Sequence, residues 1–546
     1  MNRALIPAAC AVAGLGLAAS GCGGGGGSGG GGAGVAVAPL ATASEAARFL
    51  TQATFGPTTA EIERLTATGY EAWLQEQMQL PRSSHLSYVD GFGLGPEPPQ
   101  QHRIDGWWQI AVTGPDQLRQ RVAFALSQIL VVSEVDLAGS QNTRGLANYY
   151  DLLARHAFGN YRELIEEVSL SPVMGVYLSH VRNEKAQPDR NIRPDENYAR
   201  ELMQLFSIGL VELNRDGTVR LDAQGAPIPT YSQEIIEGYA AVFTGWTYAQ
   251  APSWRNPVRN MLDPMEPFEE FHDTGQKQLL RGILAPPGGT AREDLRIALD
   301  SLFGHPNLPP FICKQLIQRL VTSNPSPAYV ERVVRVFEDD GTGERGDLGA
   351  VVRAILLDDE ARRGHTSAPA RFGKLREPLL RVTALWRAFG ARSPSGFFVY
   401  SNPERDLAQA PLRSPSVFNF YRPDFAPAGE VSDQGLVGPE LQITNESSLT
   451  SSTNRMFTNV FNRWLGGTGG GVGDPLIDVA RARELAGDAT ALVDHLDLLL
   501  LAGQMSPGLR GTLTRHIQAT PQGDGTQRAL EAIWLIVTSP EFALQR

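Results

Sequence analysis

Two short blocks of the chain hold the side chains best suited to chemistry. In the first, His272 is followed directly by Asp273 and, four positions later, by Lys277. A carboxylate next to an imidazole can fix its tautomer for work as a base or as a metal ligand. Adjacent side chains rarely point the same way, however, and a hydrogen bond that anchors a loop is the commoner use. Both interpretations stay open for this block.

The second block runs from Pro194 to Gly209 and is predicted to form a helix. Asp195 can cap this helix, Glu196 would lie favourably in its first turn, and Gly209 can end it. Glu196 and Arg200 have the i,i+4 spacing of a helical ion pair, which stabilises an exposed helix slightly.

One side of the same helix would carry a polar ladder. Asn197, Glu201 and Gln204 fall at positions i, i+4 and i+7, so their side chains can face a common binding partner. The plainer interpretation is a capped helix with solvated charges. The sharper one is a cleft whose polar ladder binds a ligand.

Together the two blocks give a set of catalytic candidates without a standard motif. An enzyme built on them would draw on Asp195, Glu196, Arg200, Glu201, His272, Asp273 and Lys277. The sequence contains neither the His-Glu-x-x-His spacing of zinc hydrolases nor the Gly-x-Ser-x-Gly of a nucleophile elbow. Gly341–Gly346 matches a dinucleotide fingerprint, but it follows a predicted helix and not a strand, so we expect a turn. We expect no metal and no cofactor.

The elements that must position these residues are mostly helices. Apolar residues recur with a 3.6-residue period along much of the chain. This period predicts helices over Ser44–Leu50, Thr58–Thr66, Glu71–Gln79, Gln117–Val132, Tyr149–Ala157, Tyr161–Leu170, Leu308–Val321, Ala328–Asp339, Leu348–Asp358, Leu375–Phe389, Asp478–Leu485, Ala489–Leu501, Ser506–Gln518 and Arg528–Thr538. The predicted fold class is mainly α, a large multi-helix globular body.

Strand signals are few and gather in one place. Asn214–Gly217 has the sequence of a tight hairpin turn, so a short β-hairpin insertion is predicted near residues 211–231. A weak similarity also links Ala354–Leu357 and Glu360 to Leu535–Val537 and Glu541. An internal repeat would explain it, and so would two amphipathic helices that each end near an acidic residue.

The N-terminus indicates export. A positive Met1–Arg3 start, an apolar run and small residues before Cys22 are typical of a bacterial lipoprotein signal, in which the Cys is lipidated. A membrane span would need about 20 apolar residues, and this run is shorter. Gly23 in place of Asp favours the outer membrane. The expected organisation is a signal peptide over residues 1–21, a Gly-rich tether over 22–43 and a single domain over 44–546, with a subdivision considered near 393–427.

Composition narrows the partners. The net charge is −11 and no block of Lys or Arg occurs, which argues against nucleic acid. With Cys22 lipidated and Cys10 lost with the signal, Cys313 has no internal disulfide partner. Aromatic pairs could form a sugar-stacking surface for a polysaccharide. The residues concerned are Trp107, Trp108, Tyr149, Tyr150, Trp246, Tyr248 and Phe418–Tyr421.

Several motifs, in the same order, resemble a known bacterial family, the domain of unknown function numbered 1800. They are Ala46–Leu50, Thr54–Thr58, Gln120–Ser127, Pro194–Gly209, Tyr231–Gln233, Phe243–Trp246, Phe271–Asp273 with Gly275 and Lys277, and Ser414–Tyr421. The resemblance implies an exported, largely helical protein with no established reaction. It also implies a paired role in the envelope with an exported sulfatase-like protein. Some members carry His where this chain has Phe206, so a metal role is not carried over to that position.

Two function classes follow. The first is a non-catalytic accessory or binding protein, anchored in the cell envelope by its N-terminal lipid and acting with an exported partner. The second is an envelope enzyme, hydrolase-like, whose site would combine the Glu, Arg, His and Asp side chains of the two blocks. The two classes differ in whether His272 and Glu201 meet in one cleft.

Overall fold

The computed structural model describes residues 41–137, 142–467 and 471–546, which belong to one compact unit. The expected signal peptide, the lipidation site at Cys22 and most of the tether lie outside the described residues. The fold class is confirmed as mainly α, and the sheets of these described residues contain only two-residue strands. Among the described helices, none is both long and apolar enough to cross a membrane.

The first part of the chain forms a continuous series of helices. They are α1 (Ala43–Ala53), α2 (Thr59–Thr68), α3 (Tyr70–Gln79), α4 (His85–Asp90), α5 (Gln101–Thr113), α6 (Gln117–Ser127), α7 (Thr143–Arg155), η2 (His156–Phe158), α8 (Tyr161–Leu170), α9 (Pro172–Tyr177), η3 (Pro188–Arg190) and α10 (Asn197–Gln204). Helix α1 begins with a capping box, in which Thr42 and Glu45 satisfy each other's backbone amides. Helix α6 is shorter than predicted, because the chain leaves the helix at Gln128, whose amide donates to Glu377 Oε2 at 2.7 Å.

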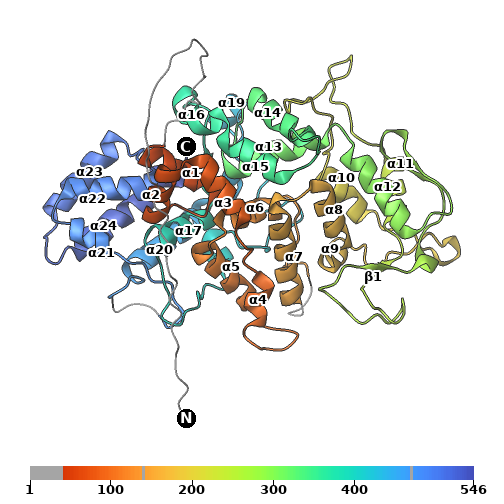
Figure 1. The fold of residues 1–546 in the computed structure, drawn as a ribbon, viewed down its shortest axis with the longest axis horizontal. Coiled ribbons are helices and arrows are strands. Elements are labelled where there is room, and N and C mark those ends of the chain that lie inside the picture. The colour runs from red at the N-terminus through yellow and green to blue at the C-terminus, as the bar shows by residue number, and fades with distance from the viewer. Residues whose placement is uncertain (1–40, 138–141, 468–470) are drawn as a thin grey trace, which may run out of the picture. The chain divides into compact units, whose positions relative to one another are not determined.

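The middle part mixes helices with short strands. It contains α11 (Gln233–Val242), β1 (Trp246–Thr247), β2 (Glu266–Pro267), η4 (Glu269–Phe271), β3 (Lys277–Gln278), η5 (Leu280–Gly282), β4 (Leu284–Ala285), α12 (Ala291–Phe303), α13 (Leu308–Leu320), α14 (Pro327–Glu338), α15 (Leu348–Leu357), α16 (Asp359–Ser367) and β5 (Lys374–Leu375). In Figure 1, α13–α15 lie between α10–α12 on one side and the N-terminal helices on the other.

The last part of the chain packs against the N-terminal helices. It comprises α17 (Pro378–Ala388), α18 (Pro403–Leu407), α19 (Glu430–Asp433), η6 (Pro439–Ile443), α20 (Glu446–Phe461), α21 (Ala480–Leu485), α22 (Ala489–Leu496), η7 (Asp497–Leu501), α23 (Pro507–Ala519), α24 (Thr526–Val537), α25 (Pro540–Ala543) and β6 (Leu544–Gln545). Helices α21–α24 gather beside α1 and α2 (Figure 1), and η7 contacts both α1 and α17.

Three antiparallel pairs make up the named strands, β1 with β2, β3 with β4 and β5 with β6. The predicted hairpin region is present as a three-segment meander held by isolated bridges. Val211 faces Pro229, Leu213 faces Val219 and Leu221 faces Pro227. The tight turn forms at the predicted place, since the Gly217 amide donates to the Asn214 carbonyl at 2.9 Å.

The weak similarity between residues 354–360 and 535–541 corresponds to a shared arrangement. Ser326 caps α14, and its amide donates to Glu360 at 2.9 Å. Ser506 caps α23 in the same way, and its amide donates to Glu541 at 2.8 Å. In each case the glutamate that binds the Ser-Pro start of a helix belongs to the second helix after it, α16 after α14 and α25 after α23. The strands that follow these two sets of helices, β5 and β6, pair with each other.

The core contains most of the aromatic side chains that were considered for a sugar-stacking surface. Trp107, Trp108, Tyr149, Tyr150, Trp246, Tyr248 and Tyr421 are buried, whereas Phe418 is 46% exposed. The segment around residues 393–427 also joins this core. The Trp108 indole donates to the Tyr400 carbonyl at 3.1 Å.

Helix α11 packs against β3 at a glycine. A Cβ added at Gly238 would lie 2.0 Å from the Gln278 carbonyl oxygen, which is backbone and cannot move aside cheaply. We expect Gly238→Ala to lower the free energy of unfolding by about 2–3 kcal/mol, the cost of overpacking a tight contact. Urea unfolding followed by circular dichroism measures this.

Gly511, inside α23, is the matched control. A Cβ there meets nothing within 4 Å, so Gly511→Ala should raise stability by about 0.5–1 kcal/mol through helix propensity. Equal effects of the two substitutions would contradict the close packing of α11 on β3.

Candidate functional site

His272, Lys277 and Asp294 form one buried cluster. The His272 Nδ1–H donates to the Thr244 carbonyl at 3.0 Å, and Nε2 lies 3.1 Å from Asp294 Oδ2. Lys277 Nζ lies 2.6 Å from the same oxygen. The side chains of His272 and Asp294 are fully buried and that of Lys277 is 1% exposed.

The cluster ties together three segments of the chain. Lys277 Nζ also donates to the carbonyls of Asp273 and Gly275, at 2.5 and 3.0 Å. Asp273 itself is half-buried, and its Oδ1 accepts from the Gly275 amide at 2.7 Å. The loop after η4 is thereby fixed to the segment after α11 and to the first turn of α12.

Burial alone would raise the pKa of the Asp294 carboxyl. The hydrogen bonds from His272 and Lys277 and the charge of Lys277 outweigh burial and hold this pKa below its ordinary value. Asp294 is therefore the carboxylate on which the cluster is centred. Asp294 was not among the predicted site residues, which included Asp273, the residue next to His272. The capping box of Thr290 and Glu293 is the signal that could have located α12 and its first turn.

Helix α10 is shorter than the predicted helix over residues 194–209. It begins at Asn197 with Glu196 as its N-cap, and it ends at Gln204. Asp195 is not the N-cap residue, but its Oδ1 accepts from the Asn197 amide, the first of the helix, at 2.8 Å. The Asp195 amide donates to Asn183 Oδ1 at 2.8 Å. Gly209 lies past a further turn, with a positive φ of 72°.

The charged residues at the start of α10 form bonds within this helix and to helix α11. Glu196 and Arg200 form the predicted ion pair at 2.9 Å. Glu196 also accepts from the Gln233 amide at 3.0 Å, which joins α10 to the first residue of α11. Glu196 is thus engaged by two partners that belong to the protein itself.

The predicted ladder is split between solvent and interior. Asn197 is exposed, Gln204 is half-buried and Glu201 is 8% exposed. Glu201 Oε2 has no hydrogen-bond partner among the described residues. Burial raises the pKa of the Glu201 carboxyl, and the charge of Arg200 opposes this only in part. Glu201 lies in the electrostatic neighbourhood of Tyr177 and Tyr231.

The two blocks are not joined directly by hydrogen bonds or ion pairs of the described residues. Helix α11 contacts both α10 and β3. Within the described part of the chain, no hydrogen bond or ion pair joins Glu201 to His272. Nor do any three His, Cys, Asp or Glu side chains of the described ranges gather as a metal site.

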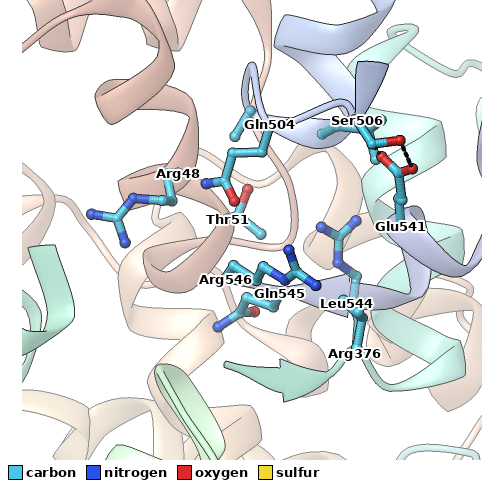
Figure 2. Close-up of a pocket in the computed structure, with 11 residues that line it drawn as sticks. Arg48, Thr51, Arg376, Gln504, Ser506, Glu541, Leu544, Gln545 and Arg546 are labelled. Atoms are coloured by element: carbon cyan, nitrogen blue, oxygen red, sulfur yellow. Dashed lines mark hydrogen bonds between the residues drawn. The ribbon is translucent and has the colours of Figure 1, made fainter. Parts of the chain in front are cut away.

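A cavity of about 180 Å³ lies elsewhere, between α1, the residue after β5, and the segments around η7 and β6. Its walls are made by Arg48, Thr51, Arg376, Leu501, Ala502, Gln504, Ser506, Glu541, Leu544, Gln545 and Arg546. Figure 2 shows the guanidinium groups of Arg376 and Arg546 directed toward the same part of the cavity, whereas that of Arg48 points away.

The cations and the carboxylate of this cavity do not pair. Glu541 accepts from the Ser506 amide and hydroxyl at 2.8 and 2.5 Å. Arg48 donates to the Ala361 carbonyl at 2.8 Å. Arg376, by contrast, is 6% exposed, and its Nε has no partner among the described residues. Burial and the nearby charge of Arg381 lower the pKa of Arg376 to about 10.

No sequence signal identified this cavity. Its lining comes from four separate segments of the chain. Arg48 belongs to the motif Ala46–Leu50, Ser506 starts a predicted helix and Glu541 is part of the weak similarity, but nothing in the sequence indicated that these residues line one cavity.

Fold and sites together define a predominantly helical protein with a closed polar cluster and an arginine-lined cavity. The chain belongs to the DUF1800 family, described as proteins of unknown function, whose model matches residues 48–544. No curated protein and no solved structure matches the chain significantly.

Proposed function

We propose that this protein is an exported cell-envelope lipoprotein that acts by binding, as the accessory of an exported partner. The proposal of a non-catalytic role rests on the cluster of His272, Lys277 and Asp294, which is closed to solvent. The side chains with the best catalytic chemistry are buried and bonded to one another. Their role is to anchor a loop.

Export and anchoring rest on the N-terminal sequence. The charged start, the apolar run and Cys22 support lipidation, and Gly23 supports the outer membrane, facing the periplasm or the cell surface. Helix α1 begins at Ala43, the last residue of the predicted tether. The partner we propose is an exported sulfatase-like protein. A polysaccharide is the second partner class, although most of the aromatic residues considered for it lie in the core.

One observation favours the alternative, an envelope enzyme of the hydrolase type. Glu201 is a buried carboxyl without a hydrogen-bond partner for Oε2, and its pKa is raised. A carboxyl whose pKa is raised by burial is a candidate general acid. A Glu201→Gln variant would lose any hydrolytic activity, and a binding protein would retain its partner in that variant.

Lipidation is tested by replacing Cys22. We expect Cys22→Ala to abolish incorporation of an alkyne-labelled fatty acid in bacterial cells and to release the protein from the membrane fraction, because the acyl chains provide the anchor. Gel fluorescence after click labelling and membrane fractionation measure both effects.

Cys313→Ala is the matched control, since Cys313 is buried in α13 and free. This variant should keep the full label. An unlabelled wild-type protein, or a labelled Cys22→Ala protein, would contradict the proposal. Cross-linking and recovery of the lipidated wild-type protein from envelopes should also yield an exported partner in stoichiometric amount, and its absence would count against the accessory role.

A further inference from the structure

The side chains that line the cavity between α1 and β6 carry a net positive charge. Three arginines line it against one glutamate, in a chain whose net charge is −11. The glutamate, Glu541, is already committed to the start of α23 through its bonds to Ser506. None of the three arginines therefore forms an ion pair with a carboxylate side chain of the described residues.

Arg376 shows the imbalance most clearly. Its side chain is more than nine-tenths buried, and its guanidinium makes no hydrogen bond to any described residue. Its contact is with the ring of Phe542, 4.7 Å from the centroid. A desolvated, unpaired cation costs the fold free energy, so its retention at a cavity wall points to a charged ligand.

The other walls define what the ligand carries. The Gln504 amide and the Arg546 guanidinium make no side-chain hydrogen bonds with the described residues, so both can donate into the cavity. Leu501, Ala502 and Leu544 supply an apolar side. The volume of about 180 Å³ exceeds that of an inorganic oxyanion alone. It leaves room for a short apolar remainder.

We infer that this cavity binds a small organic acid, through a carboxylate or phosphate group held by Arg376 and Arg546. Guanidinium groups bind both oxyanions through paired, charge-assisted hydrogen bonds. The apolar remainder of the ligand would lie against Leu501 and Leu544. The inference deepens the proposed binding role by naming a ligand class, but its test uses purified protein and can fail independently of lipidation or of partner capture.

The test is calorimetric titration of the full-length protein with three probes. They are inorganic phosphate, pentanoate and the soluble short-chain lipid dibutanoyl phosphatidylglycerol. We expect saturable binding of at least one of them, and Arg376→Gln should weaken it by about 10–100-fold, the range of a lost hydrogen bond to a charged group. Binding of the lipid alone would identify a headgroup as the source of the oxyanion; binding of phosphate or pentanoate would identify a free acid.

Arg381→Gln is the matched control. Arg381 is also desolvated, with an unpartnered Nε and a pKa lowered to about 10, but it does not line the cavity. Without ligand, both variants should unfold at a temperature equal to or above that of the wild type, because each removes an unpaired charge. Only Arg376→Gln should then lose the ligand-dependent rise in that temperature. Absence of binding by every probe, or equal binding by wild type and Arg376→Gln, would overturn the inference.

Discussion

Asp294→Asn is expected to lower the free energy of unfolding by about 3–5 kcal/mol, the range for breaking a buried ion pair on one side. Asp294 Oδ2 is the acceptor shared by His272 and Lys277. An amide removes the close buried counter-charge of the Lys277 ammonium and leaves it only the more distant, part-exposed Asp273 carboxylate at 3.7 Å. Thermal and urea unfolding of the purified variant measure the loss.

Asp300→Asn provides the control on the same helix. Asp300 is half exposed and pairs with Arg162 and Arg296 at the surface of α12. Surface pairs of this kind contribute about 0–1 kcal/mol, so this variant should unfold close to the wild type. Similar losses in the two variants would refute the special role of the Asp294 cluster.

The same cluster predicts the direction of a pH effect. Asp294 has a folded-state pKa below its ordinary value of 3.8. Its stabilising contribution is complete above that ordinary value and is lost as the pH falls through the folded-state pKa. The wild type should therefore lose stability below about pH 4 more steeply than Asp294→Asn, which no longer has this group.

Lys374→Met is also expected to lower the free energy of unfolding by about 3–5 kcal/mol. Lys374 Nζ donates to the carbonyls of Gln318 and Arg319 at 2.9 and 3.0 Å and pairs with Glu440 Oε1 at 2.9 Å. Glu377 Oε1 lies 3.9 Å away. Removal of the ammonium leaves two fully buried carboxylates next to each other without a cation at this position.

A second substitution should recover part of this loss. In the double variant Lys374→Met with Glu440→Gln, one of the stranded charges is neutralised, so unfolding should require more denaturant than in Lys374→Met alone. Lys314→Met is the control, because Lys314 is only half-buried and its one hydrogen bond, to the Gly217 carbonyl, is 3.4 Å long. A double variant no more stable than Lys374→Met would contradict the charge argument.

Helices with strong apolar periodicity could be predicted from the sequence. The predicted bounds over residues 308–357 and 506–538 agree with α13–α15 and α23–α24 to within a few residues. Helix α20 was missed because Ser and Thr fill much of it and its apolar stripe is weak. Helix α12 was missed although its capping box was present in the sequence.

The candidate site could be predicted only in part. His272 and Lys277 do share a cluster, but Asp294, which joins them, lies on a different element and has no fixed spacing to them. Glu201 could be placed on a helix, yet its burial depends on what packs over that helix. The arginine-lined cavity depends entirely on the tertiary fold, since its walls span the chain from Arg48 to Arg546.

The pairing of β5 with β6 has a consequence for the order of folding. The Gln545 amide also donates to the carbonyl of Leu320, 225 positions earlier, so the C-terminal end of α13 receives this hydrogen bond only once residue 545 is in place. Contacts of such sequence separation form slowly, because a long loop must close first. In the export that we propose, a chain transferred from its N-terminus would keep this junction open until late in transfer.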